Sequence, residues 1–465
     1  MDFRNRLSKT SIFLFLLLFL GSCESPLDPI TDPTDLTTNS ESVPTIIPTG
    51  DEQYLNTKSD FIYDQSELRT FELTIPTEDY EKINNDPAAE QYVAGSLNFE
   101  NETISPVGIR YKGSIGAFVG CLSNFDLANP SGSKTCTKLS MKVKINWEGR
   151  EEKFYGLKKL QFHSMNNDPS QLRERVAYHC FREMGVAAPR AVHARLVING
   201  EFVGLFALVE QIDGRFTRHN FEDGKGNLYK ELWPLNSAGQ ARTSADFLNA
   251  LKTNEDENPT VDLIQNFAQQ IAAASSENVP AIIEEYMDIE TMIAYAAVDR
   301  TIRNDDGAFH WYCGDGSCDP HNFYWYEETD RQKVHLIPWD TDHAFENIVF
   351  DANPIVPIAD DWGETRNDCE PFGYGVWRVQ QKSAACDKLT AGWVTYADLY
   401  EQKRQEFIET VFSAAQLEPL MTAWEAQIST ATEEAKAAHG DAVSLERWKN
   451  AVTQLRTQIE RAREL

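Results

Sequence analysis

Acidic and amide side chains are concentrated between residues 303 and 345 of this 465-residue chain. Asp305 and Asp306 come first, Asn322 follows, and Asp340 and Asp342 end the stretch. Carboxylate and amide oxygens are the ligands that Mg²⁺ prefers, and one further acid can orient a nucleophile. The order acid, amide, acid therefore predicts the magnesium–nucleotide site of a phosphotransferase. The alternative is that these residues form ordinary turns in an acidic protein.

A lysine-bearing segment could supply the opposite wall of such a site. Residues 138–145 alternate strictly, with Lys138, Ser140, Lys142 and Lys144 on one face and apolar residues on the other. A strand places alternate residues on opposite faces, and three lysines on one face repel each other unless water or an anion neutralises them. The pattern predicts a phosphate-facing strand, with a solvated edge strand as the alternative.

A glycine-containing turn follows another predicted strand, at residues 107–112. Lys112, Gly113 and Ser114 form its start. Backbone N–H groups of such a turn can approach phosphates, although any tight turn has the same composition.

A predicted helix at residues 170–184, ended by Gly185, carries a carboxylate in line with apolar residues. Glu174 heads one apolar stripe of this helix. An unpaired buried charge is costly, so Glu174 needs a cationic partner, and a strand lysine would position nucleotide phosphates with it. Pairing with Arg173 or Arg175, or simple exposure, is the alternative.

The other elements indicate an α+β protein, strand-rich first and helix-rich from about residue 262. The residues Asn199-Gly200 are typical of a type I′ hairpin turn between two of the strands. Expected strands lie at 69–76, 107–112, 138–145, 192–198, 201–209 and 227–230, and the long helical segments at 279–299 and 395–465.

The N-terminus has the pattern of an exported lipoprotein. A basic start precedes an apolar run at residues 12–20, which is too short to span a bilayer comfortably. The sequence then reaches Leu-Gly-Ser-Cys, which resembles a lipobox and implies a signal peptide at 1–22 and a lipid anchor on Cys23. An ordinary secretory signal is the alternative. Residues 23–60, rich in Pro, Thr, Asp and Ser, are expected to form a disordered tether.

Export makes disulfides the natural state of the remaining cysteines. Cys180 lies in the apolar pattern of the predicted helix and is expected to be a buried free thiol. No C-x-x-C pair is present, so zinc binding lacks support. Proximity in the sequence predicts the pairs Cys121–Cys136, Cys313–Cys318 and Cys369–Cys386.

Composition narrows the function classes. The net charge of −29 argues against nucleic-acid partners, which require basic surfaces, and 42% hydrophobic residues fit a globular core. The sequence has no H-E-x-x-H, G-x-S-x-G or EF-hand pattern, so metalloprotease, serine hydrolase and calcium-sensor functions lack their usual motifs.

Taken together, an ordered set of motifs spanning about residues 70 to 345 resembles the spore-coat protein H-like (CotH) family of atypical secreted kinases. The motifs are Arg110-Tyr111-Lys112-Gly113-Ser114, Lys138-Leu139-Ser140, Leu172-Arg173-Glu174-Arg175, Asn199-Gly200-Glu201, Glu210-Gln211-Ile212-Asp213, Asn227-Leu228-Tyr229-Lys230, His321-Asn322-Phe323-Tyr324 and Pro338-Trp339-Asp340-Thr341-Asp342.

The resemblance implies an atypical protein-kinase-like bilobal fold over residues 61–465. Its strand-rich N-lobe would end near residue 235, and a helical C-lobe would run from about 236. The cleft would hold ATP with Mg²⁺ or Mn²⁺. The acceptors would be Ser or Thr residues of secreted or surface proteins of the cell envelope.

Site residues carried over by position form two walls. On the phosphate side, Lys142 or Lys138 would bind phosphates and pair with Glu174. The segment beginning at Glu210 would lie near the adenine. On the other side, the catalytic acid would be Asp305 or Asp306, and the metal ligands would be Asn322, Asp340 and, as a second ligand, Asp342.

The chain departs from the family at one place. Asn322 lies seventeen residues after Asp305, although the family keeps this acid and amide only a few residues apart. A disulfide-closed loop at Cys313–Cys318 could bulge outward and leave its two ends close. Alternatively, Asp315 or Asp319 is the acid, or the site is degenerate.

Three functions compete. The first is a lipid-anchored extracytoplasmic protein kinase at the outer membrane or cell surface. The second is a surface adhesin or envelope scaffold on the same fold, with the tryptophan-rich stretch 311–339 as a possible sugar platform. The third is a metal-dependent hydrolase, which should have more histidines among its acids. Convergence of the lysine, the acids and the amide on one cleft separates the first from the second.

Overall fold

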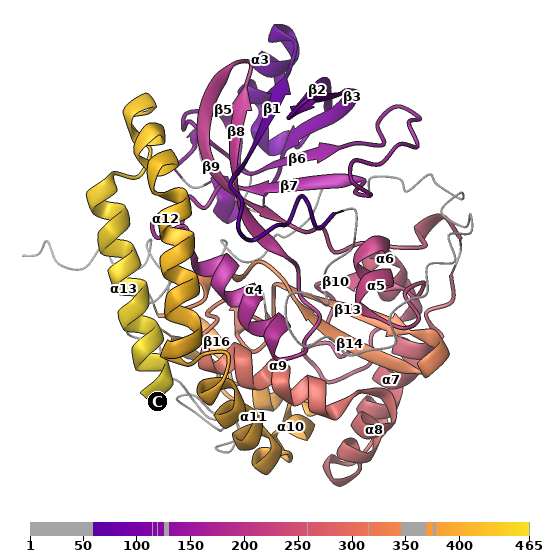
Figure 1. The fold of residues 1–465 in the computed structure, drawn as a ribbon. Helices are drawn as coiled ribbons and strands as arrows, with labels where there is room; N and C mark the ends of the chain where they lie inside the picture. Colours follow the sequence, from indigo (N-terminus) through magenta and orange to yellow (C-terminus); the bar gives the residue numbers. More distant parts are fainter. Residues whose placement is uncertain are drawn as a thin grey trace, which may run out of the picture.

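Figure 1 shows the computed structural model of the chain, which describes residues 59–464 except 114, 119, 125–129, 258, 315, 346–368 and 375–377. The predicted signal peptide, the lipidation site Cys23, nearly all of the tether and Ser114 lie outside the described residues. No helix within the described part is both long and apolar enough to cross a membrane.

Most strands of the first half form a closed barrel, which lies at the top of Figure 1. β8 closes it by pairing in parallel with β1. In order around the barrel, the strands are β1 (Arg69–Thr74), β2 (Val93–Phe99), β3 (Glu102–Tyr111), β6 (Met141–Lys144), β7 (Lys159–His163), β9 (Glu201–Val209) and β8 (Ala191–Ile198).

The alternation predicted for residues 138–145 is confirmed. The apolar face points into the core of the barrel and comprises Leu139, Met141, Val143 and Ile145. β6 pairs with β3 on one side and β7 on the other, so the edge-strand alternative is wrong.

The Asn-Gly hairpin is also confirmed between β8 and β9. Asn199 and Gly200 have φ values of 52° and 82°. A type I′ turn needs positive φ at both central residues, which asparagine and glycine tolerate best.

The second half contains helices, as predicted, together with small sheets; the strand predicted at residues 227–230 is present as β10 (Leu228–Lys230), whereas the other strands of these sheets were not predicted. A continuous buried run such as Phe323–Glu328 has no alternation, so its pattern does not distinguish a strand from a helix. One sheet has the order β10 (Leu228–Lys230), β13 (Phe323–Glu328), β14 (Lys333–Pro338). Another has the order β12 (Ser317–Asp319), β11 (Trp311–Gly314), β16 (Val379–Lys382), β15 (Phe372–Tyr374). In the first half, a separate two-stranded sheet pairs β4 (Leu122–Asn124) with β5 (Ser131–Lys134).

The helix predicted at 170–184 is present as α4 (Arg173–Glu183), and Gly185 follows with a φ of 76°. The segment predicted at 279–299 is two helices, because Asp288 starts the second by accepting from the Thr291 N–H. These two helices are α8 (Val279–Tyr286) and α9 (Ile289–Thr301). The other helices are α3 (Thr77–Asn85), α5 (Gly214–Asn220), α6 (Ser244–Ala250), α7 (Asp262–Ala273), α10 (Lys388–Val394), α11 (Ala397–Glu409), α12 (Ala414–Ala438) and α13 (Leu445–Glu464).

Two apolar cores organise this mixed α+β fold. One fills the barrel, and the other joins α4 to the helices and the β10–β13–β14 sheet below the barrel. In Figure 1, α12 and α13 form a hairpin along one side of the molecule, next to α4. The sites discussed below lie where α4, the barrel and the small sheet meet.

All three predicted disulfides are present: Cys121–Cys136, Cys313–Cys318 and Cys369–Cys386. Cys180 is a buried free thiol, as expected, and burial raises its pKa.

Candidate active site

The small sheet brings the amide and the last acids of the motif together. β13 and β14 are antiparallel with Phe323 opposite Pro338, and the Trp339 N–H donates to the Asn322 carbonyl at 3.0 Å. The residue that precedes β13 therefore lies beside the residues that follow β14. Asn322 and Asp340 both have positive φ values, 57° and 53°, which Asn and Asp tolerate better than most residues.

The paired acids reach the same place from the end of α9. The Asn322 amide donates to the Asp306 carboxylate at 2.8 Å and to the Asp306 carbonyl at 3.1 Å. The intervening insertion folds back on itself, with Cys313 opposite Cys318 in the β11–β12 hairpin. The outward-bulging loop with close ends is thus confirmed.

Among the candidate acids that the structure describes, Asp306 is the one bonded to Asn322. The carboxylate of Asp305 is buried and its charge acts on Arg173, while its carbonyl accepts from the Tyr312 hydroxyl. Asp319 pairs with Arg242 at 3.3 Å, and Asp315 lies outside the described residues.

Glu174 is buried in the first turn of α4 and faces a histidine that the motif analysis missed. Its two carboxylate oxygens lie 2.9 and 3.0 Å from His163 Nδ1, and Lys112 Nζ lies 2.7 Å from His163 Nε2. An ammonium group can only donate, so Nε2 accepts and the Nδ1–H donates to Glu174. Burial, with the Lys112 charge second, lowers the pKa of His163 to about 3, so the imidazole is neutral.

The lysine linked to Glu174 is Lys112, which follows β3, rather than the predicted Lys142 or Lys138, and the link runs through His163 as a Lys112–His163–Glu174 chain. Local pairing with Arg175 is wrong, because that guanidinium is bonded to Gln65, His193 and Gln427. Exposure is wrong as well, since Glu174 is only 3% exposed.

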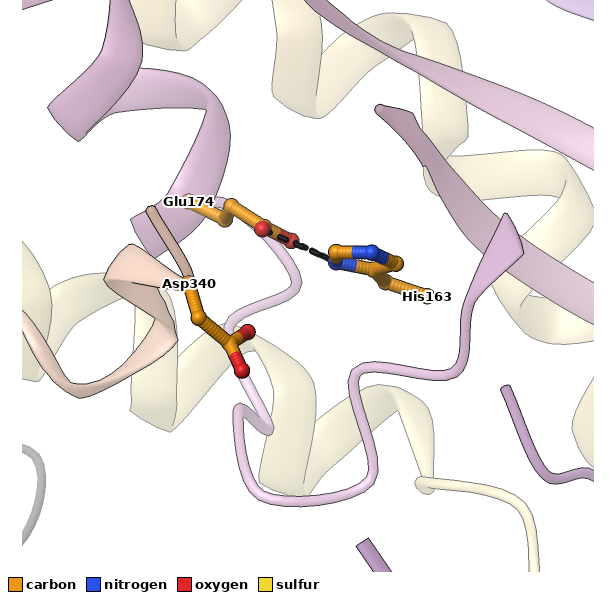
Figure 2. A group of neighbouring side chains, drawn as sticks. All are labelled: His163, Glu174 and Asp340. Carbon is orange, nitrogen blue, oxygen red and sulfur yellow. Dashed lines mark hydrogen bonds and ion pairs between the residues drawn. The ribbon is translucent and has the colours of Figure 1, made fainter. Parts of the chain in front are cut away.

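Asp340 lies beside the Glu174–His163 pair, as Figure 2 shows. His163, Glu174 and Asp340 each present a possible ligand atom, and these atoms lie within 4.8 Å of one another. The Tyr178 hydroxyl, one turn after Glu174 on α4, accepts from the Asp340 N–H at 2.9 Å. Because the histidine nitrogens are occupied by Lys112 and Glu174, the two carboxylates are the natural cation ligands.

The carboxylates concentrate negative charge in a buried space. Burial and the charge of Asp340 raise the pKa of Glu174, Asp306 and Asp342 well above the usual values. Asp306 Oδ1 also has no hydrogen-bond partner among the described residues. Carboxylate oxygens that repel one another are suited to binding a divalent cation such as Mg²⁺ or Mn²⁺, which prefers oxygen ligands and neutralises their charge. Glu174 thus joins Asp340 and Asp342 as a candidate cation ligand, while the amide nitrogen of the third predicted ligand, Asn322, is bonded to Asp306.

Three lysine charges act on His163. The charges of Lys112, Lys142 and Lys230 all act on this imidazole, after burial, to lower its pKa. Lys142 is a predicted phosphate ligand, and it is buried in the barrel wall.

Lys138 is directed elsewhere, which corrects its proposed place in the nucleotide site. Its Nζ donates to the Leu205 carbonyl at 2.7 Å and lies 5.3 Å from the Phe206 ring centroid. Burial lowers its pKa to about 8. Lys142 lies in β6, whereas Lys138 precedes this strand, so the two lysines have different neighbours.

Gly113 and Glu210 also have partners of their own. The Gly113 N–H donates to Glu90 at 2.7 Å, and its φ of 152° with Ala117 directly opposite requires glycine. Both carboxylate oxygens of Glu210 accept from Arg190, at 2.6 and 3.0 Å. The Glu210 side chain is therefore held in an ion pair with Arg190, and the expected place of its segment near the adenine stays a prediction.

Comparison with known proteins agrees with this geometry. The family described as "CotH kinase protein" matches residues 109–465. The chain belongs to the CotH family. The match begins within β3, so Lys112, Glu174, Asp306 and Asp340 all lie inside it.

Two curated relatives share part of this CotH chain. One is invasin CotH7 of Rhizopus delemar, 24% identical over 185 residues, which covers 39% of this chain and 30% of the relative. The other is inner spore coat protein H of Bacillus subtilis, 20% identical over 200 residues, which covers 41% of this chain and 50% of the relative. The chain thus spans half or less of each relative's length.

A buried acid supports the loop that carries Asp306 and gives a pH-dependent prediction. Asp299 accepts from the Asn304 amide at 2.9 Å, and burial raises its pKa to about 7. The folded chain takes up this proton at a higher pH than the unfolded chain does, so the contribution of Asp299 to stability rises as pH falls from about 8 to about 5.

Asp299→Asn should remove that contribution. We expect the variant to gain stability over the wild type at pH about 8, by as much as several kcal/mol, and to lose this advantage progressively as pH falls from about 7 to about 4. Urea unfolding of both proteins across this range measures the difference. Identical pH dependence in the two proteins would contradict the raised pKa.

Proposed function

We propose that this CotH chain is an extracytoplasmic protein kinase that transfers the γ-phosphate of ATP to Ser or Thr hydroxyls of secreted or surface proteins. The observation that carries the proposal is that Glu174 and Asp340 lie together beside His163, that the charge of Asp340 acts on Asp306, and that the charges of Lys112 and Lys142 act on His163. An adhesin has no need to bury acids and lysines against each other, and doing so is costly.

Each residue then has a role in phosphoryl transfer. Asp306, held by Asn322, orients the acceptor hydroxyl and takes its proton. Glu174 and Asp340 hold a divalent cation, with Asp342 nearby as a second ligand. Lys112 and Lys142 bind the phosphates. Mg²⁺ or Mn²⁺ would supply neutralisation of the negative charge on the transferred group.

The proposal extends to the kinase-like bilobal arrangement. The barrel with its own core would be the N-lobe, ending near residue 235, and the helical part would be the C-lobe. The strand-to-helix passage after Glu210 would lie near the adenine. In this proposal, Cys23 carries the lipid anchor and residues 23–60 tether the kinase to the outer membrane or cell surface.

A second candidate is a non-catalytic surface adhesin or envelope scaffold. The relative from Rhizopus delemar is named an invasin, and the Bacillus subtilis relative is named a spore coat protein. Both names fit a surface location without requiring catalysis.

Two measurements on the wild-type chain separate these functions. Calorimetry with ATP and Mn²⁺ or Mg²⁺ should show metal-dependent nucleotide binding. Incubation with γ-labelled ATP and a casein-type acceptor should label Ser or Thr. An absence of nucleotide binding with either metal overturns the kinase proposal and leaves the adhesin.

A further inference from the structure

Arg173, the residue before Glu174, joins three separate segments at the start of α4. Its Nη1 donates to the carbonyls of Ala344 and Phe345, both at 2.8 Å, and its Nη2 donates to Gln458 Oε1 of α13 at 2.8 Å. Its Nε lies 3.4 Å from Asp168. The side chain is 4% exposed, so this is a buried, multiply bonded guanidinium.

These contacts connect the two acids proposed to hold the cation. Ala344 and Phe345 follow Asp340 in the same short segment, while Glu174 is the chain neighbour of Arg173. A planar guanidinium has fixed donor directions, so holding both segments with one group fixes their spacing. The orientation of that group is set in turn by Gln458.

Further bonds from the same C-terminal hairpin reach the first turn of α4 and the residues just before it. Trp448 of α13 donates from its indole nitrogen to the Ser170 carbonyl at 3.0 Å. Gln171 donates to the Thr432 hydroxyl of α12 at 3.3 Å. Arg175 donates to Gln427 of α12 at 2.8 Å, and its guanidinium lies 4.3 Å from the centroid of the Trp424 ring.

We infer that Arg173 and Gln458 are positioning residues through which the α12–α13 hairpin sets the distance between Glu174 and Asp340. The C-terminal hairpin is thus part of the cation site without contacting the cation. Side-chain bonds from α12 and α13 reach α4 or the segment leading into it at four positions, 170, 171, 173 and 175. As far as metal affinity and catalysis are concerned, this inference rests on the proposed function.

The chain offers a matched set of variants. Gln458→Leu removes the acceptor for Arg173, whereas Gln458→Glu keeps it. Gln458 Nε2 makes no hydrogen bond among the described residues, so the Glu variant loses no donated bond. Arg173→Lys keeps the charge but cannot reach all the acceptors at once.

Arg456→Met is the control for general weakening of the hairpin. Arg456 lies on α13 near Gln458, and its guanidinium bonds to Glu418 and Glu425 of α12, both at 2.9 Å. Its loss weakens the contact between α12 and α13 without removing a bond to α4.

Three readouts on the full chain test the inference. For Gln458→Leu and Arg173→Lys, we expect Mn²⁺ affinity by calorimetry and kcat/KM for phosphate transfer to fall roughly ten- to a hundredfold, the effect of losing a buried bond to a charged group. Amide hydrogen exchange of α4 in the metal-free chain should accelerate in the same variants. Gln458→Glu and Arg456→Met should match the wild type in all three.

The readouts keep this inference separate from the proposed function. A wild type that binds Mn²⁺ but transfers no phosphate overturns the kinase, and Mn²⁺ affinity then still tests the positioning role. A wild type that binds no Mn²⁺ leaves α4 exchange as the deciding measurement. Unchanged α4 exchange in Gln458→Leu, or an equal loss in Arg456→Met, overturns the positioning role.

Discussion

Asp340→Asn is expected to abolish Mn²⁺ binding measurable by calorimetry and to lower phosphate transfer by at least about 10³-fold, since a metal ligand supplies several kcal/mol of transition-state stabilisation. Asparagine has nearly the same shape and tolerates the positive φ of 53° at this position. The fold should therefore survive, and the loss should be specific to the site.

The same variant has a second expected result that a purely structural acid would not give. After burial, the charge of Asp340 is the next cause that raises the pKa of Glu174, Asp306 and Asp342. Removing it relieves repulsion in the metal-free protein, so Asp340→Asn should unfold at a higher urea concentration than the wild type without metal. Active sites often retain such destabilising charges because function requires them.

Asp330→Asn is the matched control, because Asp330 lies on the exposed turn between β13 and β14 at the opposite end of the sheet from Asp340. It should leave metal binding, transfer and stability unchanged. Retention of wild-type Mn²⁺ affinity in Asp340→Asn would remove Asp340 from the cation site.

The second large effect is expected from Lys112→Met, which should lower kcat/KM for ATP by roughly 10²-fold or more through loss of charge stabilisation at the phosphates. Lys112 lies 2.7 Å from His163 Nε2, and its Nζ is 5.3 Å from the centroid of the Trp339 ring, next to Asp340 in the chain. Methionine keeps most of the side-chain volume while removing the ammonium group.

Lys138→Met provides the comparison. Lys138 precedes β6, the strand that contains Lys142, and its Nζ is bonded to the Leu205 carbonyl. This substitution should leave ATP kinetics at the wild-type level, as measured by initial rates over a range of ATP concentrations. The reverse result, with Lys138→Met inactive and Lys112→Met active, would show that Lys138 rather than Lys112 binds the phosphates.

Local features were predictable because they depend on neighbours in the chain. The alternation at residues 138–145 reflects the two faces of a strand, and the Asn199-Gly200 turn reflects the φ values that these two residues allow. The three disulfides join cysteines 5 to 17 residues apart. The β13–β14 sheet was missed because its buried run lacks a period.

The chemistry of the site was predictable only in part. The sequence alone determined that acids, an amide, lysines and Glu174 were present in an order typical of CotH proteins, since residue types and spacing are local properties. His163 gave no signal in the sequence, where no strand was predicted at residues 159–163, although it links Lys112 to Glu174.

Only the tertiary structure decided which of these residues meet. It bonds Asp306 to Asn322, directs Lys138 to the Leu205 carbonyl, and joins Arg173 to Gln458 across 285 residues. Such contacts depend on how the barrel curves, how the sheet strands align and where the C-terminal hairpin packs. The pattern of a single segment contains none of this information. The residue types of the site could therefore be predicted from the sequence, whereas their contacts depend on tertiary packing.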